Sequence, residues 1–248
     1  MVDYTRFNSK QLASRLLFIT NRKNMHYLRK TTLLAILAVI AFASCKKDEL
    51  ETPQISALSI VNASAGSPGV NVYIDQTRLS DDLFTFGKNI EYFNAYSGER
   101  EISFYQGSNK NASGKFNLKD GKFYSLFLTG KWPQTELVLL KDSLIKPATG
   151  KAHIRFVNMG TDAGVLNLGL TNGSTLISQK AYKSSSDFTP VNGNTGYSFV
   201  IRNNAAPTDT VSIPQVTLEA GHSYTIWAKG VKGELGNDAL GLSVIKNY

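Results

Sequence analysis

The sequence predicts an all-β protein built from two tandem β-sandwich modules. Three observations support this prediction: apolar residues recur at every second position, glycines separate the alternating stretches, and segments of the first half recur in the second half. Val70, Val72 and Ile74, for example, alternate with Asn, Tyr and Asp. Alternate residues of a β-strand point to the same face, so this pattern is typical of a strand buried on one side.

An internal repeat divides the chain into two parts. The matched segments, in order, are 58–62 with 154–158, 70–74 with 166–170, 93–98 with 188–193, 118–124 with 218–224, and 139–141 with 244–246. Because the order is kept and the offset changes only by amounts that loops can absorb, we interpret the segments as two copies of one module. We predict modules at 56–143 and 151–248, joined by a short linker around Lys146–Gly150.

Each module contains about seven short alternating stretches with turn signals every 8–12 residues, the pattern of an immunoglobulin-like β-sandwich. A small barrel is the structural alternative. Each module is long enough to bury its own core, which allows two independent units arranged like beads on a string. Asn62 and Asn158 recur where the first strand of each copy ends, and we interpret them as side chains that cap the following turn.

The N-terminal segment 1–44 is predicted to be an extension followed by a signal peptide, with Met25 as the expected start of translation. Leu33–Ala43 is an apolar run of 11 residues, too short for a membrane span and of the length found in secretory signals. Together with Cys45, the only cysteine, this segment resembles a bacterial lipoprotein signal peptide, although Phe42 replaces the usual leucine. The resemblance implies that Cys45 becomes the first mature residue and carries lipid, including an acyl chain such as palmitate.

We expect the segment 45–55 to be the lipidated tether, because it is short and rich in charged residues. The stretch Lys46–Glu51 resembles the signal that exports lipoproteins to the outer face of some Gram-negative outer membranes. We therefore expect a lipid-anchored protein exposed on the cell surface, and an anchor that faces the periplasm is the alternative. Two or more acyl chains would hold such a protein stably on the membrane.

The net charge excludes nucleic acid as a partner. The whole chain carries a formal charge of +8, but the leader before Cys45 has seven basic residues and one acidic residue. From Cys45 onward twenty basic residues face eighteen acidic ones, and no basic block remains. The electrostatic footprint needed to bind phosphate backbones is therefore missing.

Several segments resemble a bacterial family of domains of unknown function, family 4397. The segments that carry the resemblance are Val61–Ser64, Val70–Asp75, Phe86–Gly87, Tyr92–Gly98 and Leu118–Tyr124. The resemblance covers most of 57–141 and, more loosely, 152–247, where Gly169–Thr171 replaces the Tyr-x-Asp end of the second strand. The family has no established activity, so the resemblance implies only fold and location.

The motifs of catalysis and metal binding do not appear in the sequence, so we expect a protein that is not an enzyme and needs no cofactor or metal. No Gly-x-Ser-x-Gly elbow or phosphate-binding glycine loop is present. We interpret His153, His222 and the Asp81–Asp82 pair as surface residues, and Glu99 and Glu101 as charges on the outer face of a strand.

Aromatic residues are the remaining candidates for binding. Trp132 lies in a predicted hairpin connection and could stack on a sugar or anchor a protein partner, with Tyr96 as a second contact. The alternative for Trp132 is packing at the module edge or between modules. Trp227 is expected to pack either between modules or on a covered second face of its sheet. We thus expect a binding, adhesion or scaffolding protein. Glycans are one class of ligand that it could bind. A spacer or docking module for another envelope protein is the alternative, and a hydrolase ranks third.

Overall fold

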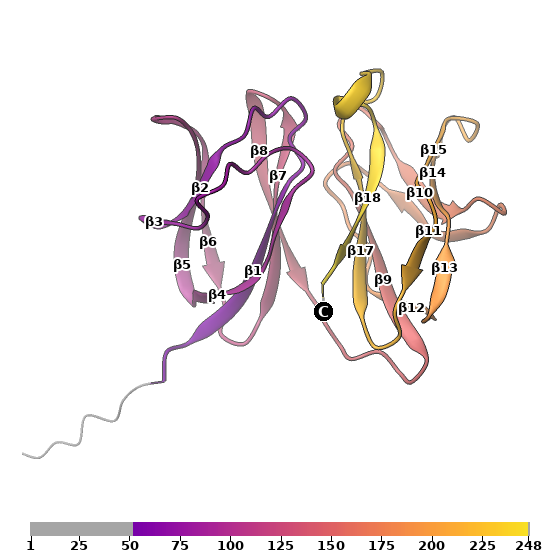
Figure 1. Ribbon diagram of the computed structural model, residues 1–248, viewed down its shortest axis with the longest axis horizontal. Helices are drawn as coiled ribbons and strands as arrows, with labels where there is room; N and C mark the ends of the chain where they lie inside the picture. Colours follow the sequence, from indigo (N-terminus) through magenta and orange to yellow (C-terminus); the bar gives the residue numbers. More distant parts are fainter. Residues whose placement is uncertain (1–51, 248) are drawn as a thin grey trace, which may run out of the picture. The chain divides into compact units, whose positions relative to one another are not determined.

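The computed structural model describes residues 52–247, and nearly all of its regular structure is β-strand. Residues 53–248 form one compact unit. The predicted signal peptide and Cys45 lie outside the described residues. Among the described residues, no helix is long and apolar enough to cross a membrane. The prediction of an all-β fold made of sandwich modules is confirmed (Figure 1).

The first module consists of two four-stranded sheets. One has the order β4-β1-β7-β8 and the other the order β3-β2-β5-β6. Their strands are β1 (Ile55–Asn62), β2 (Asn71–Ile74), β3 (Thr77–Arg78), β4 (Asn89–Tyr96), β5 (Gly98–Gln106), β6 (Asn109–Leu118), β7 (Phe123–Lys131) and β8 (Gln134–Asp142). The core between the two sheets includes Leu58 and Leu126 from one sheet and Val72 and Phe104 from the other, all essentially inaccessible to solvent.

The second module repeats this arrangement with sheets in the orders β12-β9-β17-β18 and β11-β10-β14-β15, and β13 and β16 form a small additional ribbon. The elements are β9 (Lys151–Asn158), β10 (Leu166–Leu170), β11 (Thr175–Lys180), β12 (Thr189–Asn192), β13 (Thr195–Tyr197), β14 (Phe199–Asn203), β15 (Thr210–Ser212), β16 (Val216–Leu218), β17 (Ser223–Lys229), a 3-10 turn η1 (Gly236–Asp238) and β18 (Gly241–Lys246). Phe156, Leu168 and Ile226 lie in its core.

The two modules agree in strand register as well as in order. β1 runs parallel to β7 with Leu58 opposite Tyr124, and β9 runs parallel to β17 with Ile154 opposite Tyr224. Each of these tyrosine hydroxyls accepts a hydrogen bond from the backbone amide five residues earlier, at 3.1 Å for Tyr124 and 3.0 Å for Tyr224. The strand order differs from the ABED and CFG sheets of an immunoglobulin constant domain, so the likeness to that fold lies in the two-sheet architecture.

The repeated asparagines cap the turns that follow the first strand of each module, as the sequence predicts. The Oδ1 atom of Asn62 accepts the amide of Ser64, and that of Asn158 accepts the amide of Gly160, both at 3.1 Å. Each side-chain amide also donates to backbone carbonyls, including that of Phe84 for Asn62. Both asparagines are fully buried, and these hydrogen bonds compensate their loss of solvation.

A third apolar cluster joins the two modules. It contains Val61, Phe127, Val157 and Trp227, which lie on the faces of β1, β7, β9 and β17 that point away from the two module cores. The rings of Phe127 and Trp227 meet edge to face at 6.0 Å. The packing of Trp227 between modules is therefore confirmed. Independent beads on a string are wrong, because the inner sheets of both modules share a buried interface.

The interface has approximate twofold symmetry. Thr129 of the first module lies 3.2 Å from the hydroxyl of Tyr182 in the second. Lys229 of the second module is equivalent to Thr129, and Phe86 of the first module is equivalent to Tyr182. The Lys229 ammonium lies 5.3 Å from the centre of the Phe86 ring, so the same pair of positions meets a second time with the modules exchanged. In an interface of this kind the same surface patch is used by both halves.

A buried ion pair crosses the interface. Arg155 on β9 pairs with Asp142 at the end of β8, and their side chains are 3% and 0% exposed. Arg155 also donates to Ser125 at 3.0 Å and to Thr225 at 2.8 Å, while Ser125 donates to Asp142 at 2.6 Å. These hydrogen bonds draw on both modules, so the charges are satisfied only when the modules are together.

We predict that Arg155→Met lowers the free energy of unfolding by about 3–5 kcal/mol, because the Asp142 carboxylate stays buried without its partner. The Lys115–Glu99 pair is exposed and screened by solvent, so Lys115→Met should change the free energy of unfolding far less. Urea unfolding followed by tryptophan fluorescence measures both values. An Arg155→Met loss no larger than that of Lys115→Met would contradict the stabilising role of the buried pair. Adding Asp142→Leu to Arg155→Met should recover part of the loss.

Candidate functional site

One pocket lies at one end of the second module. It has a volume of about 350 Å³ and opens between β10, β14, β15 and the connection from β17 to β18. In the first module the equivalent strands β7 and β8 are joined by the tight turn at Trp132–Pro133. In the second module the connection runs from 230 to 240 and contains η1. The longer connection is what gives this pocket one of its walls.

The pocket combines an apolar floor with a charged rim. Leu166, Ile201 and Leu240 contribute apolar surface, and they continue the packing of the module core. At the rim the ammonium of Lys232 pairs with Asp209 at 2.9 Å, and both side chains are about half exposed. A few polar groups around an apolar hollow are typical of small-ligand sites, in which the floor takes an apolar group and the rim orients a polar one.

Asn203, which also lines the pocket, has a structural role. Its side-chain amide donates to the carbonyl of Ala163 at 2.7 Å, and its Oδ1 accepts the amides of Ala205 and Ala206. These bonds hold the loop between β14 and β15 and fix the position of the neighbouring pocket wall.

The 230–240 connection is braced against the first module. Asp238 accepts the backbone amide of Gly66 at 2.7 Å, and Glu234 pairs with Lys131. Lys131 carries a raised pKa, because its ammonium donates to the Glu234 carboxylate. The wall of the pocket is therefore positioned by residues of both modules.

A second pocket, of about 290 Å³, lies at the junction of the modules, and we call it the junction pocket. It is lined by Ser59, Glu91, Tyr92, Ile245, Lys246 and Asn247. The Tyr92 hydroxyl donates to Asp142, and the amide of Asn247 donates to that hydroxyl at 3.3 Å. Burial and the neighbouring Asp142 carboxylate raise the pKa of Tyr92 well above its ordinary value of 10.0. Tyr92 therefore links this pocket to the buried ion pair.

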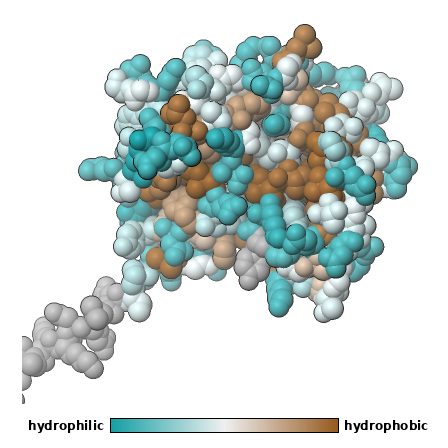
Figure 2. Space-filling view, in the orientation of Figure 1, coloured by the Kyte–Doolittle hydropathy of each residue, from teal (hydrophilic) through white to brown (hydrophobic). Residues whose placement is uncertain are grey.

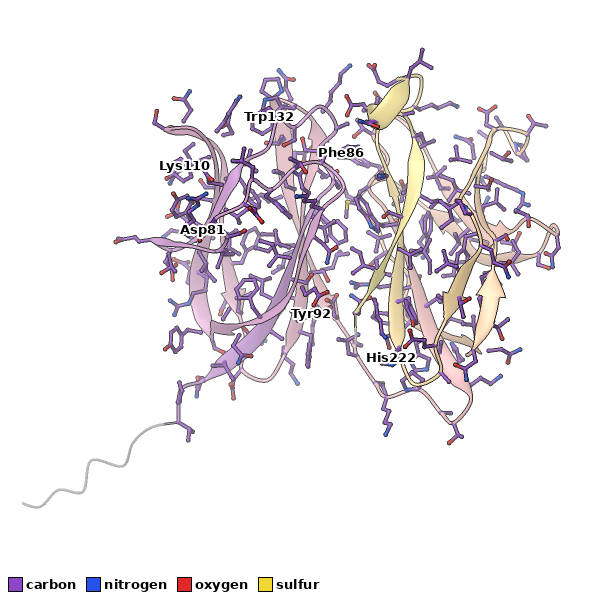
Figure 3. The ribbon with its side chains drawn as sticks, in the orientation of Figure 1. Asp81, Phe86, Tyr92, Lys110, Trp132 and His222 are labelled. Atoms are coloured by element: carbon purple, nitrogen blue, oxygen red, sulfur yellow. The ribbon has the colours of Figure 1, made fainter. Side chains whose placement is uncertain are left out.

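The structure does not bring together the two aromatic residues singled out in the sequence, and Figure 3 shows Trp132 at one end of the first module. Trp132 packs partly buried against the first-module core, and its amide donates to Ala65 beyond the end of β1. Tyr96 is 64% exposed and lies opposite Ile55, where β1 begins. The length of β1, roughly 25 Å for eight residues, separates them, so they do not form one platform.

The charged residues considered in the sequence lie on the surface. Asp81 and Asp82 are exposed in a loop, while Glu99 and Glu101 pair with Lys115 and Lys110 on an outer face. His222 lies 3.5 Å from Glu219. Within 52–247, no group of three or more His, Cys, Asp or Glu side chains is placed to hold a metal ion.

Neither pocket was found by sequence reasoning. The only signal of the larger pocket is the increase of the repeat offset from 100 at Leu118–Tyr124 to 105 at Leu139–Lys141, which marks extra residues between β17 and β18. The junction pocket leaves no such signal, because it depends on which faces of the two modules meet.

The comparison with protein families gives one match. Residues 56–169 match a family model described as domain of unknown function (DUF4397). This segment resembles that family. The match spans the first module and continues through β9 and most of β10 of the second. The family resemblance expected from the sequence is supported over these residues, and no curated protein matches the chain.

We predict a stability loss at high pH that depends on Tyr92. Its folded-state pKa lies above the unfolded value, so its contribution is complete below about pH 10 and is lost as the pH rises further. Tyr92→Phe should therefore flatten the fall in unfolding free energy between about pH 10 and 12. Urea titrations across this range measure the slope. Tyr96→Phe, which changes an exposed tyrosine, is the control, and an equal effect of both variants would contradict the assignment.

Proposed function

We propose that the chain is a lipid-anchored protein of the bacterial cell envelope that binds a ligand without catalysis, and that the 350 Å³ pocket of the second module is its ligand site. The observation that supports this proposal is the combination of an apolar floor, a charged rim and an elongated loop found in only one of two otherwise similar modules. Its volume lies within the range of about 300–1,000 Å³ that ligand sites occupy.

Bracing of the loop supports a binding role. Gly66 and Lys131 of the first module hold the 230–240 connection in place before a ligand binds, so binding requires little further ordering of this connection. A preorganised site loses less conformational entropy on binding. The ligand that fits this chemistry is a small molecule or side chain with an apolar body and a polar head.

The position of the pocket suits display away from a membrane. The proposed tether from Cys45 joins the fold where β1 begins, at Ile55, whereas η1 and the 230–240 connection lie at the other end of the strands (Figure 1). The pocket thus lies at the end of the fold remote from the point where the proposed tether joins it. We propose the outer membrane as the location, with surface exposure.

We further propose that 151–248 is a second copy of the module that begins at 56. The matched sheet orders, the equal registers of β1 with β7 and β9 with β17, and the paired asparagine caps support this. Duplication followed by lengthening of one loop would account for a binding site in only one copy.

A docking role for a protein partner is the second candidate. Leu235, at the tip of the elongated connection, is 89% exposed, and an exposed leucine beside a pocket is suited to protein contact. On the face shown in Figure 2, apolar side chains gather mainly over the second module. Glycan binding through Trp132 and Tyr96 has less support because the two lie at opposite ends of the first module, and no described cluster favours a hydrolase.

The anchor is tested with Cys45→Ser. Expressed from Met1 in a Gram-negative host, the natural chain should enter the detergent phase on Triton X-114 partitioning, and Cys45→Ser should move to the aqueous phase because two or more acyl chains are needed for stable anchoring. Mass spectrometry of the N-terminal peptide detects the acylated cysteine. Detergent partitioning that persists in Cys45→Ser would overturn the anchor, and protease treatment of intact cells separates surface from periplasmic display.

The ligand site is tested with Thr210→Trp, which places a large ring at the rim of the pocket on an exposed strand position. Residues 53–248 are screened by NMR against a library of small apolar-polar fragments and against a glycan array. We expect hits whose shifts map to Leu166, Ile201 and Leu240, and at least a tenfold loss of affinity in Thr210→Trp. Ser212→Trp, two residues along the same strand and outside the pocket, should bind normally. Hits that map elsewhere and survive Thr210→Trp would contradict the proposal.

A further inference from the structure

The approximate symmetry of the interface sets four pairs of equivalent positions around the buried ion pair. Strand register makes Ser59 equivalent to Arg155 and Ser125 equivalent to Thr225. The ladders of β8 and β18 make Asp142 equivalent to Asn247. Those of β4 and β12 set Phe93 opposite Leu58 and Thr189 opposite Ile154, so Tyr92 is equivalent to Phe188, and the pairing of 93–98 with 188–193 expected from the sequence is wrong by one residue. The two halves of the interface therefore present the same positions with different side chains.

One half is filled by an arginine of the chain itself. The guanidinium of Arg155 lies 4.9 Å from the centre of the Phe188 ring and reaches across to Asp142 and Ser125 of the other module. It also donates to Thr225 of its own module at 2.8 Å. A guanidinium held over an aromatic face by a planar set of hydrogen-bond acceptors is the arrangement that arginine favours.

The other half has no such side chain. Ser59 stands where Arg155 stands in the repeat, and its hydroxyl donates to the carbonyl of Ile90 at 2.8 Å instead of crossing the interface. The junction pocket lies at this place, and Ser59, Tyr92 and Asn247, the equivalents of Arg155, Phe188 and Asp142, are three of its lining residues. The pocket thus corresponds by symmetry to the space that the Arg155 side chain occupies.

The charges around the junction pocket suit a guest cation. Asn247 is neutral where its equivalent Asp142 is charged, but Glu91 supplies a carboxylate, and Glu91 takes part in none of the ion pairs found among the described residues. The ammonium of Lys246, the one cation in the lining, pairs with Glu219 at 2.8 Å. Tyr92, the equivalent of Phe188, supplies an aromatic side chain to the lining of the pocket.

We propose that the junction pocket binds a guanidinium group, which would lie between the Tyr92 ring and the Glu91 carboxylate as Arg155 lies between Phe188 and Asp142. The group could come from a free arginine-like molecule or from an arginine side chain of a protein partner. The proposal concerns a different pocket from the one assigned as the ligand site of the second module and does not depend on it.

The test uses residues 53–248, which form one compact unit, titrated with L-argininamide and followed by NMR and calorimetry. L-citrullinamide, which has nearly the same shape without the charge, is the matched probe. We expect argininamide to shift the signals of Tyr92 and Asn247 and to bind at least tenfold more tightly than citrullinamide. Equal binding of the two probes, or shifts only outside the pocket, would overturn the proposal.

Two variants check the location. Glu91→Gln should weaken argininamide binding at least fivefold, and Asp82→Asn, which removes an exposed loop carboxylate of the same module, should not change it. Ser59→Arg should fill the pocket from within, abolish argininamide binding and raise the melting temperature. Binding that is unchanged in Glu91→Gln would overturn the proposal even if Ser59→Arg does not fold.

A capped tripeptide with a central arginine distinguishes the two sources. Binding of this peptide as tight as that of argininamide indicates that the side chain alone is recognised, as expected for a protein partner. Loss of peptide binding with retained argininamide binding indicates a free small cation. Failure of both probes in the folded natural protein would overturn the guanidinium site.

Discussion

The structure depends on burying one charge pair between two modules. Arg155 and Asp142 come from different modules, and neither side chain retains appreciable contact with solvent. Removing two charges from water is unfavourable unless they are paired and fully hydrogen-bonded, and here Ser125 and Thr225 complete the set. Neither module alone can form this network. Breaking only one partner inside the assembled interface leaves the other charge buried, whereas the apolar contact of Phe127 with Trp227 opposes separation of the modules.

This constraint explains why differences in sequence between the modules become differences in local structure. Two similar sandwiches that meet face to face produce equivalent surroundings twice, so any difference in sequence shows up as an asymmetry at the interface. The exchange of Arg155 for Ser59 leaves one half of the junction hollow. The added residues between β17 and β18 build a pocket wall in one module only, and contacts with Gly66 and Lys131 hold that wall in place.

The principal elements of the fold were accessible from local patterns. Period-two alternation identifies strands such as β2 and β10, and glycines with left-handed backbone conformations, such as Gly121 and Gly221, mark the turns between strands. The asparagine caps were also predictable, because an Asn side chain acts on the backbone two residues ahead of it. These features need only near neighbours in the chain.

The sequence by itself determined the strand content, the similarity between segments of its two halves, the turn caps and the near balance of basic and acidic residues from Cys45 onward. Only the tertiary structure decided that the inner sheets of the modules pack on each other, that Trp132 and Tyr96 lie apart, and that the pocket of the second module and the junction pocket form. Pairing of Arg155 with Asp142, and of β1 with a strand more than sixty residues later, depends on contacts between distant segments. Such contacts are selected by the total buried surface and charge of the folded chain, which no local pattern encodes.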